Sequence, residues 1–427
     1  MGKSAVAVYL QIPYDGHDVH YTELRKREQP MASGTAFHPR TSAICHSQAW
    51  RQWSGFLAAS SYNEFVQPEY AAIRHAAAMI DVSPLYKYDV SGSDAVTLMD
   101  RVFTQDMAAV AMGRVVYTPW CDSDGKVRQE GTVFRFADDA YRVCAAEPTL
   151  GWLKRNAVGL DVEFRDRTDE LAALSLQGPT SRDVLRSATS VDVDNLKFFG
   201  FADGEIDGVP VSISRTGYTG DLGYEIWLPA DKALQVWDAL MESGEPWHIT
   251  PCGLAAMDIS RVEAGFILIG VDYVSSERAR LPHHKASPYE LGLGWAVKLN
   301  KSGNFVGRSA LEAEKLNGGA RRVVGLEIEW EPLESLFGRA GMMPDLPLAT
   351  HRDPVPVYDG PGEQVGRATT RVWSALLKKY LAIATVESKY ASPGMRLNME
   401  VTVDFERRTA PARVVTMPFF RPERMRA

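Results

Sequence analysis

The sequence predicts an α+β body followed by an all-β, barrel-like C-terminal domain. The chain has 427 residues, of which 45% are hydrophobic and 24% charged, a composition that suits two or three globular domains. Helical and strand patterns are mixed over residues 66–319. After Gly319 the run RRVVGLEIEW alternates strictly, and strand-like runs recur to the end with little helical pattern. We therefore predict an N-terminal extension packed on the body (1–65), the α+β body (66–319) and a β-barrel domain (320–427).

The first half of the body shows helix and strand signals in turn. Apolar residues at helical spacing predict a helix over 68–81. A strand is predicted over 87–92, and a helix over 93–103 with Ser93 as its N-cap. The turn signals D-S-D-G and A-D-D then divide residues 113–147 into three strands.

The second half of the body continues this mixture. Pro179 suits the first turn of a helix, Gly265 suits a helix stop, and Ser309 with Glu312 forms a capping-box pattern. The predicted elements, in order, are a helix over 178–189, a hairpin of 209–215 and 224–229, helices over 233–241 and 252–265, a strand over 292–300 and a helix over 306–319.

Composition and motifs exclude several classes of protein. The net charge of −7 argues against a nucleic-acid partner. No apolar run approaches the ~18 residues that span a bilayer, and a signal peptide's apolar core is missing, so we expect a cytoplasmic protein without a membrane partner. The histidines form no metal-ligand pattern, and nucleotide-binding glycine motifs and G-x-S-x-G are absent. We expect the four cysteines to be buried free thiols: Cys45, Cys121, Cys144 and Cys252.

The stretch SRTGYTGDLGYEIWLP, residues 214–229, carries an unusual acid. Two Thr-Gly steps make an elaborate turn, and Glu225 follows it on a strand. A buried carboxylate is costly unless it is paired. Glu225 could therefore meet Arg215 or Arg261, point to solvent, or accept two hydrogen bonds from a planar ligand that carries an amino group beside a ring N–H.

Six segments stand in order between residues 80 and 310: IDVSPLYKYDVSG, VVYTPWCDSDGKV, LSLQGPTSRDVL, SRTGYTGDLGYEI, CGLAAMDISRVEAGF and PYELGLGWAVKLNKSGNFVGRSAL. Together they resemble the folate-binding aminomethyltransferase family, whose best-known member is the T-protein of the glycine cleavage system. The resemblance implies two intertwined α+β domains plus a C-terminal β-barrel around a central folate channel. It also implies tetrahydrofolate as the cofactor and no metal.

The resemblance implies which residues hold the folate. Glu225 would bind the amino-amide edge of the pterin ring, and Tyr218 would line the same pocket. Tyr117 matches a tyrosine that stacks on the pterin or hydrogen-bonds to it, and it is also a catalytic candidate. Phe198 and Phe199 lie where the family places aromatic residues near the ring.

Further residues are assigned to the same site by the resemblance. Glu130 takes the place of the family's catalytic aspartate, one methylene longer, and would orient the folate nitrogen and handle its proton. Arg261 and Trp295 are assigned to the folate site, although a structural ion pair between Arg261 and Asp258 fits equally well. Lys87 is expected to face the one-carbon donor.

The sequence departs from the family pattern where the donor should lie. Cys144 stands at a typical asparagine, Met257 replaces an arginine, and the segment 274–286 is longer than the usual link. Three functions are therefore weighed. The preferred one is a demethylase that moves a methyl group from a small O-, S- or N-methyl donor to tetrahydrofolate. The alternatives are an aminomethyltransferase that forms methylene-tetrahydrofolate and needs a lipoyl carrier protein, and a folate-binding accessory protein without turnover.

Overall fold

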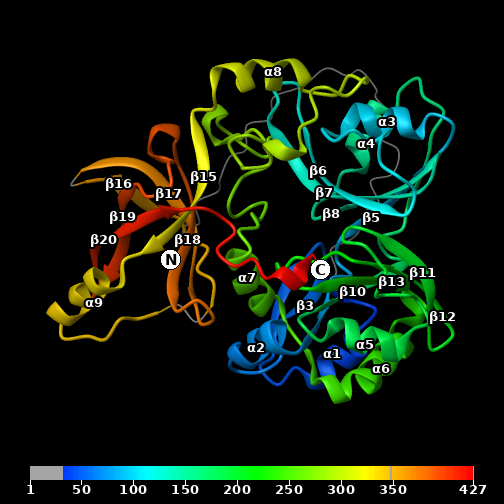
Figure 1. The fold of residues 1–427 in the computed structure, drawn as a ribbon, viewed down its shortest axis with the longest axis horizontal. Coiled ribbons are helices and arrows are strands. Elements are labelled where there is room, and N and C mark those ends of the chain that lie inside the picture. Colours follow the sequence, from blue (N-terminus) through cyan, green and yellow to red (C-terminus); the bar gives the residue numbers. More distant parts are fainter. Residues whose placement is uncertain (1–31, 347–348, 361, 427) are drawn as a thin grey trace, which may run out of the picture.

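The computed structural model describes residues 32–346, 349–360 and 362–426, and it consists of three units around a central helix, α7 (Leu254–Glu263) (Figure 1). The first unit is a five-stranded sheet whose outer face is covered by α3 (Ala95–Val102) and α4 (Leu150–Asn156). The strands of this sheet, in spatial order, are β6 (Arg114–Cys121), β7 (Val127–Ala137), β8 (Ala140–Ala145), β5 (Tyr86–Ser91) and β9 (Glu163–Asp166).

The second unit is a six-stranded sheet packed on α5 (Ser181–Ala188) and α6 (Ala233–Gly244). Its strands, in spatial order, are β11 (Phe201–Ile206), β12 (Val209–Ser214), β13 (Gly223–Pro229), β10 (Leu171–Gln177), β4 (Ala77–Asp81) and β14 (Ile249–Pro251). The chain leaves this sheet after β4, builds the whole five-stranded sheet, and returns at β10. The two α+β units are therefore intertwined, as predicted.

The third unit is a closed β-barrel, which confirms the predicted C-terminal architecture (Figure 1). The barrel order is β15 (Arg321–Ile328), β18 (Lys379–Glu387), β17 (Glu363–Ser374), β16 (Val355–Asp359), β19 (Arg396–Val403) and β20 (Glu406–Val415). The alternation predicted for β15 is present, since Val324, Leu326 and Ile328 are buried in the barrel core. Closure pairs every strand on both sides, which removes exposed sheet edges.

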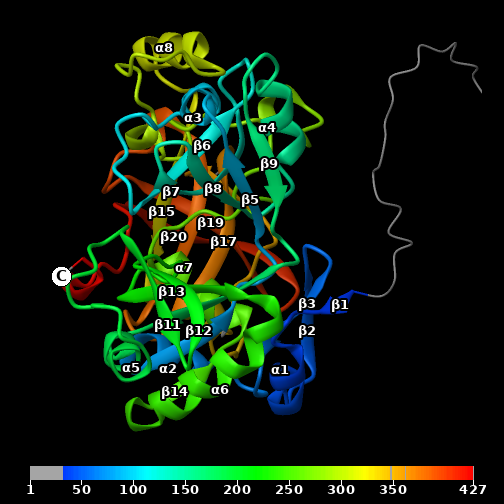
Figure 2. The same ribbon diagram turned by 90° about the vertical axis from the view of Figure 1, so that its right-hand side faces the viewer.

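One hydrophobic cluster joins the three units. It brings together Ile73 of α2 (Gln67–His75), Phe134 of the first sheet, Trp227 of the second, Val262 of α7 and Leu381 of the barrel. Figure 1 shows α7 between the barrel and the six-stranded sheet, and Figure 2 shows the molecule turned by 90°, with the five-stranded sheet above the six-stranded one. Because a shared core resists relative motion, groups contributed by different units have fixed positions here.

Residues 32–61 form α1 (His38–Ile44) and a small sheet of β1 (Ser33–Gly34), β3 (Phe56–Ser61) and β2 (Ala49–Trp53). Arg40 forms an ion pair with Asp238 of α6 at 2.6 Å, which attaches this segment to the second unit. The part of the predicted extension before residue 32 lies outside the described residues. In the described ranges, no helix has the length and hydropathy that crossing a bilayer requires.

Two predicted elements are wrong. The helix predicted over 68–81 ends at His75, and Ala77–Asp81 is the strand β4, which pairs with β10 and β14. All five residues of β4 are buried, so a strand covered on both faces shows the same apolar run as a helix. The strand predicted over 292–300 is a 3₁₀ turn, Gly294–Ala296, with irregular flanks.

The predicted helix caps are also wrong, although both helices exist. The Ser93 hydroxyl bonds to Asp161 at 2.8 Å instead of capping α3. Helix α8 (Arg308–Asn317) starts after Gly307, whose φ is +87°, and Glu312 pairs with Arg308 rather than with a cap. Gly307 is needed because a Cβ there would lie 2.6 Å from the Asp122 carbonyl oxygen.

One helix of the C-terminal domain was not predicted. Helix α9 (Trp330–Arg339) follows β15, so Trp330 begins a helix and does not continue the strand face. Leu333 and Phe337 of α9 are buried at helical spacing against the barrel. All four cysteines are buried and free, which confirms that prediction.

Candidate active site

The turn between β12 and β13 is fixed by close packing of its glycines. A Cβ at Gly217 or Gly223 would lie 2.2 Å from the side chain of Gln177, and one at Gly220 would lie 2.4 Å from Ala264. Gln177 in turn accepts a hydrogen bond from the Thr219 hydroxyl at 2.7 Å. The two Thr-Gly steps of the sequence therefore allow the turn to press against β10 and α7.

Glu225 has no cationic partner among the residues that the structure describes. The Thr216 hydroxyl donates to its Oε2 at 2.6 Å, and Ser214 bonds to that hydroxyl at 2.7 Å. Neither of the arginines considered from the sequence, Arg215 or Arg261, forms an ion pair with it. Burial raises the pKa of Glu225, and the Thr216 hydrogen bond offsets part of that shift. One carboxylate oxygen remains open to a ligand with adjacent N–H donors, which fits the edge of a pterin.

Glu130, on β7, is a second buried carboxylate. Burial raises its pKa to about 8, and the nearby acids Glu147 and Asp272 add to the shift. The Tyr273 hydroxyl hydrogen-bonds to its Oε2. At pH 7 Glu130 is therefore mostly protonated, a state suited to a general acid.

Two aromatic pairs lie near Glu130. Tyr117 stacks on Trp295, with ring centroids 6.1 Å apart, and Tyr218 stacks on Phe266 at 5.5 Å. The Tyr218 hydroxyl donates to a backbone carbonyl. Burial raises the pKa of both tyrosines, and the charge of Glu130 contributes to each shift, so Tyr117 and Tyr218 lie near that carboxyl group. The structure thus brings together four of the predicted site residues: Glu130, Tyr117, Tyr218 and Trp295.

Phe198 and Phe199 join the two sheets. The Phe199 N–H donates to the Arg215 carbonyl at 3.0 Å, and its own carbonyl accepts from Val115 of β6 at 2.9 Å. Phe199 has φ of +58°, which turns the chain sharply between these partners. The Phe198 ring contacts Phe199 edge-on at 4.8 Å and lies under the Arg426 guanidinium.

Arg261 is fully buried, and each of its three side-chain nitrogens donates to a protein group. It pairs with Asp258 at 2.8 Å and with Asp272, and it donates to Thr370 of the barrel at 3.1 Å. The ion pair with Asp258 considered from the sequence is therefore present. Arg261 therefore connects α7 to the barrel, and its buried guanidinium group is held by protein partners.

Lys87 does not face a donor site. Its side chain is fully buried, and its ammonium group donates to the carbonyls of Ser83 at 2.7 Å and Leu85 at 2.8 Å. Burial lowers its pKa to about 8. The lysine therefore holds the loop between β4 and β5.

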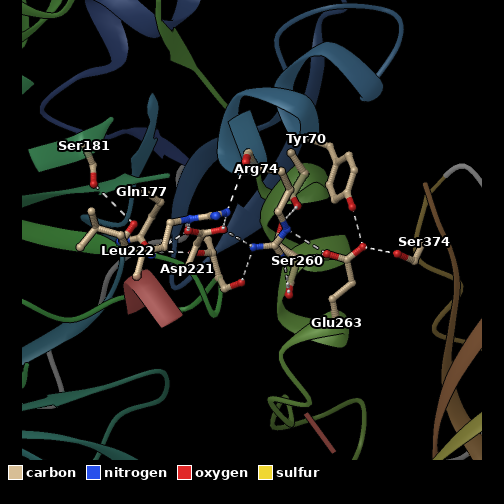
Figure 3. A network of polar contacts seen from close by, with 12 residues as sticks. Tyr70, Arg74, Gln177, Ser181, Asp221, Leu222, Ser260, Glu263 and Ser374 are labelled. Carbon is tan, nitrogen blue, oxygen red and sulfur yellow. Dashed lines mark hydrogen bonds and ion pairs between the residues drawn. The ribbon is translucent and has the colours of Figure 1, made fainter. Parts of the chain in front are cut away.

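A second buried network lies beside the turn (Figure 3). Arg74 of α2 pairs with Glu263 of α7 at 2.7 Å and with Asp221 of the turn at 3.2 Å, and all three side chains have no solvent exposure. Glu263 also accepts from Ser374 of the barrel at 2.5 Å, and Arg424 near the C-terminus pairs with Asp221. The network therefore fixes the turn against both α7 and the barrel.

Removing the charge of Glu263 is expected to destabilise the protein. We expect Glu263→Gln to lower the free energy of unfolding by about 3 kcal/mol, because the buried Arg74 loses the nearer of its two ionic partners in the described chain and keeps only Asp221. Glu312→Gln, on exposed α8, should cost under about 0.5 kcal/mol. Chemical denaturation followed by circular dichroism would measure both. Equal losses in the two variants would contradict a structural role for the network.

Sequence analysis missed several groups in this site. Thr216 supports Glu225, Tyr273 bonds to Glu130, and Arg74 anchors the turn from a helix about 140 residues earlier. Only the GVDY run, an acid and an aromatic just before the long segment 274–286, marks Tyr273 in the sequence. The structure places no group of three or more metal-ligating side chains together in its described part.

Comparison with known proteins agrees with this fold. Two family models match the chain: "GCVT N-terminal domain" over residues 37–301 and "Glycine cleavage T-protein C-terminal barrel domain" over residues 321–421. A crystal structure of glycine cleavage system aminomethyltransferase T from Bartonella henselae superimposes with a TM-score of 0.77. It covers 91% of this chain and 98% of that one at 21% identity, which shows the shared fold.

Curated relatives extend the similarity to sequence. The chain is 35% identical to an aminomethyltransferase of Anoxybacillus flavithermus over 361 residues, 83% of this chain and 90% of the relative. It is 34% identical to one of Streptomyces avermitilis, over 83% and 90%, and 32% identical to one of Bacillus subtilis, over 83% and 91%. The fold and the family matches are those of a folate-dependent one-carbon transferase. The chain belongs to the glycine cleavage T-protein family, whose enzymes use tetrahydrofolate.

Proposed function

We propose that this enzyme transfers a one-carbon unit from an aminomethyl donor to tetrahydrofolate, forming methylene-tetrahydrofolate. The observation that carries this proposal is the similarity to aminomethyltransferases over 90% of a relative's length. It favours this reaction over the demethylation preferred from the sequence alone. In such a reaction the donor is carried on the lipoyl arm of a partner protein.

Glu225 and the aromatic residues would hold the folate. The open carboxylate oxygen of Glu225 would accept hydrogen bonds from the pterin edge, with Thr216 fixing the other oxygen. Tyr218 and the Tyr117–Trp295 stack offer ring faces for a flat ligand. Tetrahydrofolate supplies the nucleophilic 5-nitrogen that receives the one-carbon unit.

Glu130 would act on protons in the reaction. A leaving amine departs more easily when it gains a proton, and protonated Glu130 can donate one. The Tyr273 hydroxyl orients this carboxyl group, which limits the positions its proton can take. Holding acid and reactants in one geometry supplies much of the rate enhancement in such transfers.

Demethylation remains the second candidate because the Tyr273 hydroxyl lies against the protonated carboxyl group of Glu130. A methyl ether leaves more readily when its oxygen is protonated, and Tyr273 bonded to Glu130 provides that chemistry. Met257 at the family's arginine and the long segment 274–286 also alter the side where a donor would enter.

The product on folate separates these candidates. Purified protein would be incubated with tetrahydrofolate and either an aminomethyl-lipoyl carrier protein or a panel of methylated ethers, sulfonium compounds and amines, with the folate followed by mass spectrometry. A methylene product from the carrier supports the proposal. A 5-methyl product from one panel member would replace it with demethylation, and tight folate binding without any product would indicate an accessory role.

Replacing Tyr273 tests its link to Glu130. We expect Tyr273→Phe to lower kcat about 10-fold, because one hydrogen bond that orients the acid is lost. The tyrosine hydroxyl donates to the ionised carboxylate, so its removal should move the apparent pKa of the pH–rate profile upward. Tyr289→Phe is the matched control, since the Tyr289 hydroxyl has no hydrogen-bond partner among the residues that the structure describes. An unaltered pH–rate profile in Tyr273→Phe would contradict an effect of the Tyr273 hydroxyl on Glu130.

A further inference from the structure

The loop of residues 266–273, which follows α7, contacts the candidate site at both of its ends. Near its start, the carbonyl of Ile267 accepts a hydrogen bond from the Tyr218 hydroxyl. At its end, the Tyr273 hydroxyl donates to the carboxyl group of Glu130. The path of this loop therefore determines where Tyr273 meets the proposed acid.

The start and the end of the loop are held by different contacts. The start is held by α7, because Arg261 donates to the Phe266 carbonyl at 3.0 Å and the Phe266 N–H donates to the Arg261 carbonyl at 2.9 Å. The end is held through Asp272, the residue before Tyr273. One oxygen of this buried carboxylate pairs with Arg261 at 2.5 Å and accepts from the N–H of Leu268 at 2.9 Å.

A β-bulge in the barrel brings two hydroxyl groups to the other oxygen of Asp272. The register of β17 against β18 shifts between Ala368 and Thr370, so Thr369 is the extra residue of the bulge. In a regular strand, adjacent side chains point to opposite faces of the sheet. Here the hydroxyls of Thr369 and Thr370 both donate to Oδ1 of Asp272, each at 2.6 Å, and all three side chains are buried. The bulge therefore redirects a side chain toward Asp272.

We propose that Asp272, held by the two threonines of the bulge, is a positioning residue that fixes Tyr273 so that the tyrosine hydroxyl orients Glu130. Hydrogen bonds to an ionised carboxylate are short and strong, so two buried hydroxyls leave Asp272 little freedom to move. The neighbouring Tyr273 is then confined as well. The barrel thus acts on the reaction through the loop 266–273. This assignment rests on the proposed function, because it takes Glu130 as the acid of that reaction.

The threonines give a cleaner test than Asp272 itself. Glu130 faces five other ionisable side chains: Tyr273, Glu147, Asp272, Tyr117 and Tyr218. The charge of Asp272 raises the pKa of Glu130, so replacing Asp272 would shift that pKa even without any movement of Tyr273. Thr369→Val/Thr370→Val removes two hydroxyls and alters none of these charges. Thr369→Ser/Thr370→Ser, which retains both hydroxyls, is the matched control.

The titration of Glu130 in the full chain reports this positioning without turnover. Carbon-13 NMR of protein labelled at the glutamate carboxyl carbons would follow it from pH 6 to 10, and Glu130→Gln would identify its signal. In wild type the midpoint is expected at a pH of about 8. The double valine variant should move it upward by about one pH unit, because Tyr273 no longer donates to the ionised carboxylate. The double serine variant should keep the wild-type midpoint.

A double-mutant cycle with Tyr273→Phe separates positioning from a loss of stability. The double valine variant is expected to lower kcat about 10-fold with little change in the KM for tetrahydrofolate, since α7 still holds the start of the loop. In the Tyr273→Phe background it should lower kcat no further. Val357→Ala, in the barrel core, is the stability control. It should lower the melting temperature while leaving the titration of Glu130 unchanged.

The outcomes distinguish this assignment from the proposed reaction. An unmoved Glu130 midpoint in the double valine variant overturns the positioning role, and so does a loss of kcat that is equally large with and without Tyr273→Phe. The same shift of the midpoint in Val357→Ala would attribute the effect to stability and would also overturn it. A midpoint that moves in the valine variant alone, in a protein that forms no methylene product, would refute the proposed reaction and leave Asp272 assigned to positioning Tyr273.

Discussion

Replacing Glu225 with alanine is expected to weaken tetrahydrofolate binding about 100-fold while leaving the protein at least as stable as wild type. Two charge-assisted hydrogen bonds to the pterin edge are lost, which together contribute roughly 3 kcal/mol. The carboxylate is costly in the free protein because it is buried without a cation. Fluorescence titration would give the affinity, and thermal melting the stability.

The control for Glu225 is Glu205→Ala, which removes an exposed acid from the same sheet. It should change neither affinity nor melting temperature. The raised pKa of Glu225 adds a pH signature: ionisation destabilises the folded state as pH rises above about 4.5, so the variant's advantage in melting temperature should grow over that range. Wild-type affinity for tetrahydrofolate in Glu225→Ala would contradict the assignment of Glu225 to the pterin edge.

Replacing Glu130 with glutamine is expected to lower kcat by about 100- to 1,000-fold, because an amide cannot donate a carboxyl proton. In wild type, kcat should fall as pH rises through about 8, since the protonated acid is lost there. That limb should vanish in Glu130→Gln. Steady-state rates from pH 6 to 10 would measure both effects, and tetrahydrofolate affinity should change little.

Stability gives an independent measure of Glu130. Its folded pKa of about 8 lies above the ordinary 4.5, so both states are protonated below pH 4.5 and the carboxyl group contributes nothing there. Between these values it destabilises the fold by about 1.4 kcal/mol per pH unit, a penalty absent from Glu130→Gln. Glu163→Gln, an exposed acid on β9, is the control for rate and stability. A glutamine variant that keeps the rate and the pH limb would exclude Glu130 as the acid.

The local sequence pattern predicted the secondary structure correctly where a single conformational preference determines it. The hairpin of 209–215 and 224–229 follows from alternation and a glycine-rich turn, and the helix stop at Gly265 follows from its left-handed φ of +68°. The barrel follows from repeated strands after Gly319. Residue order also carried the family resemblance, which assigned Glu225, Glu130, Tyr117 and Tyr218 to one site, and the structure places both tyrosines near Glu130. The matched families then moved the favoured reaction from demethylation to aminomethyl transfer.

Only the tertiary structure determined which groups contact the buried acids Glu225 and Glu130. The sequence left open an arginine partner for Glu225, and the described part of the fold supplies a threonine hydroxyl and no cation. It gave no reason to join Tyr273 to Glu130, 143 positions apart. Strand β4 was predicted as helix because it is buried on both faces, so its sequence lacks the alternation of apolar and polar residues that marks a half-buried strand. Such features depend on contacts between distant segments, and the free energy of a buried charge is set by those contacts rather than by its neighbours in the chain.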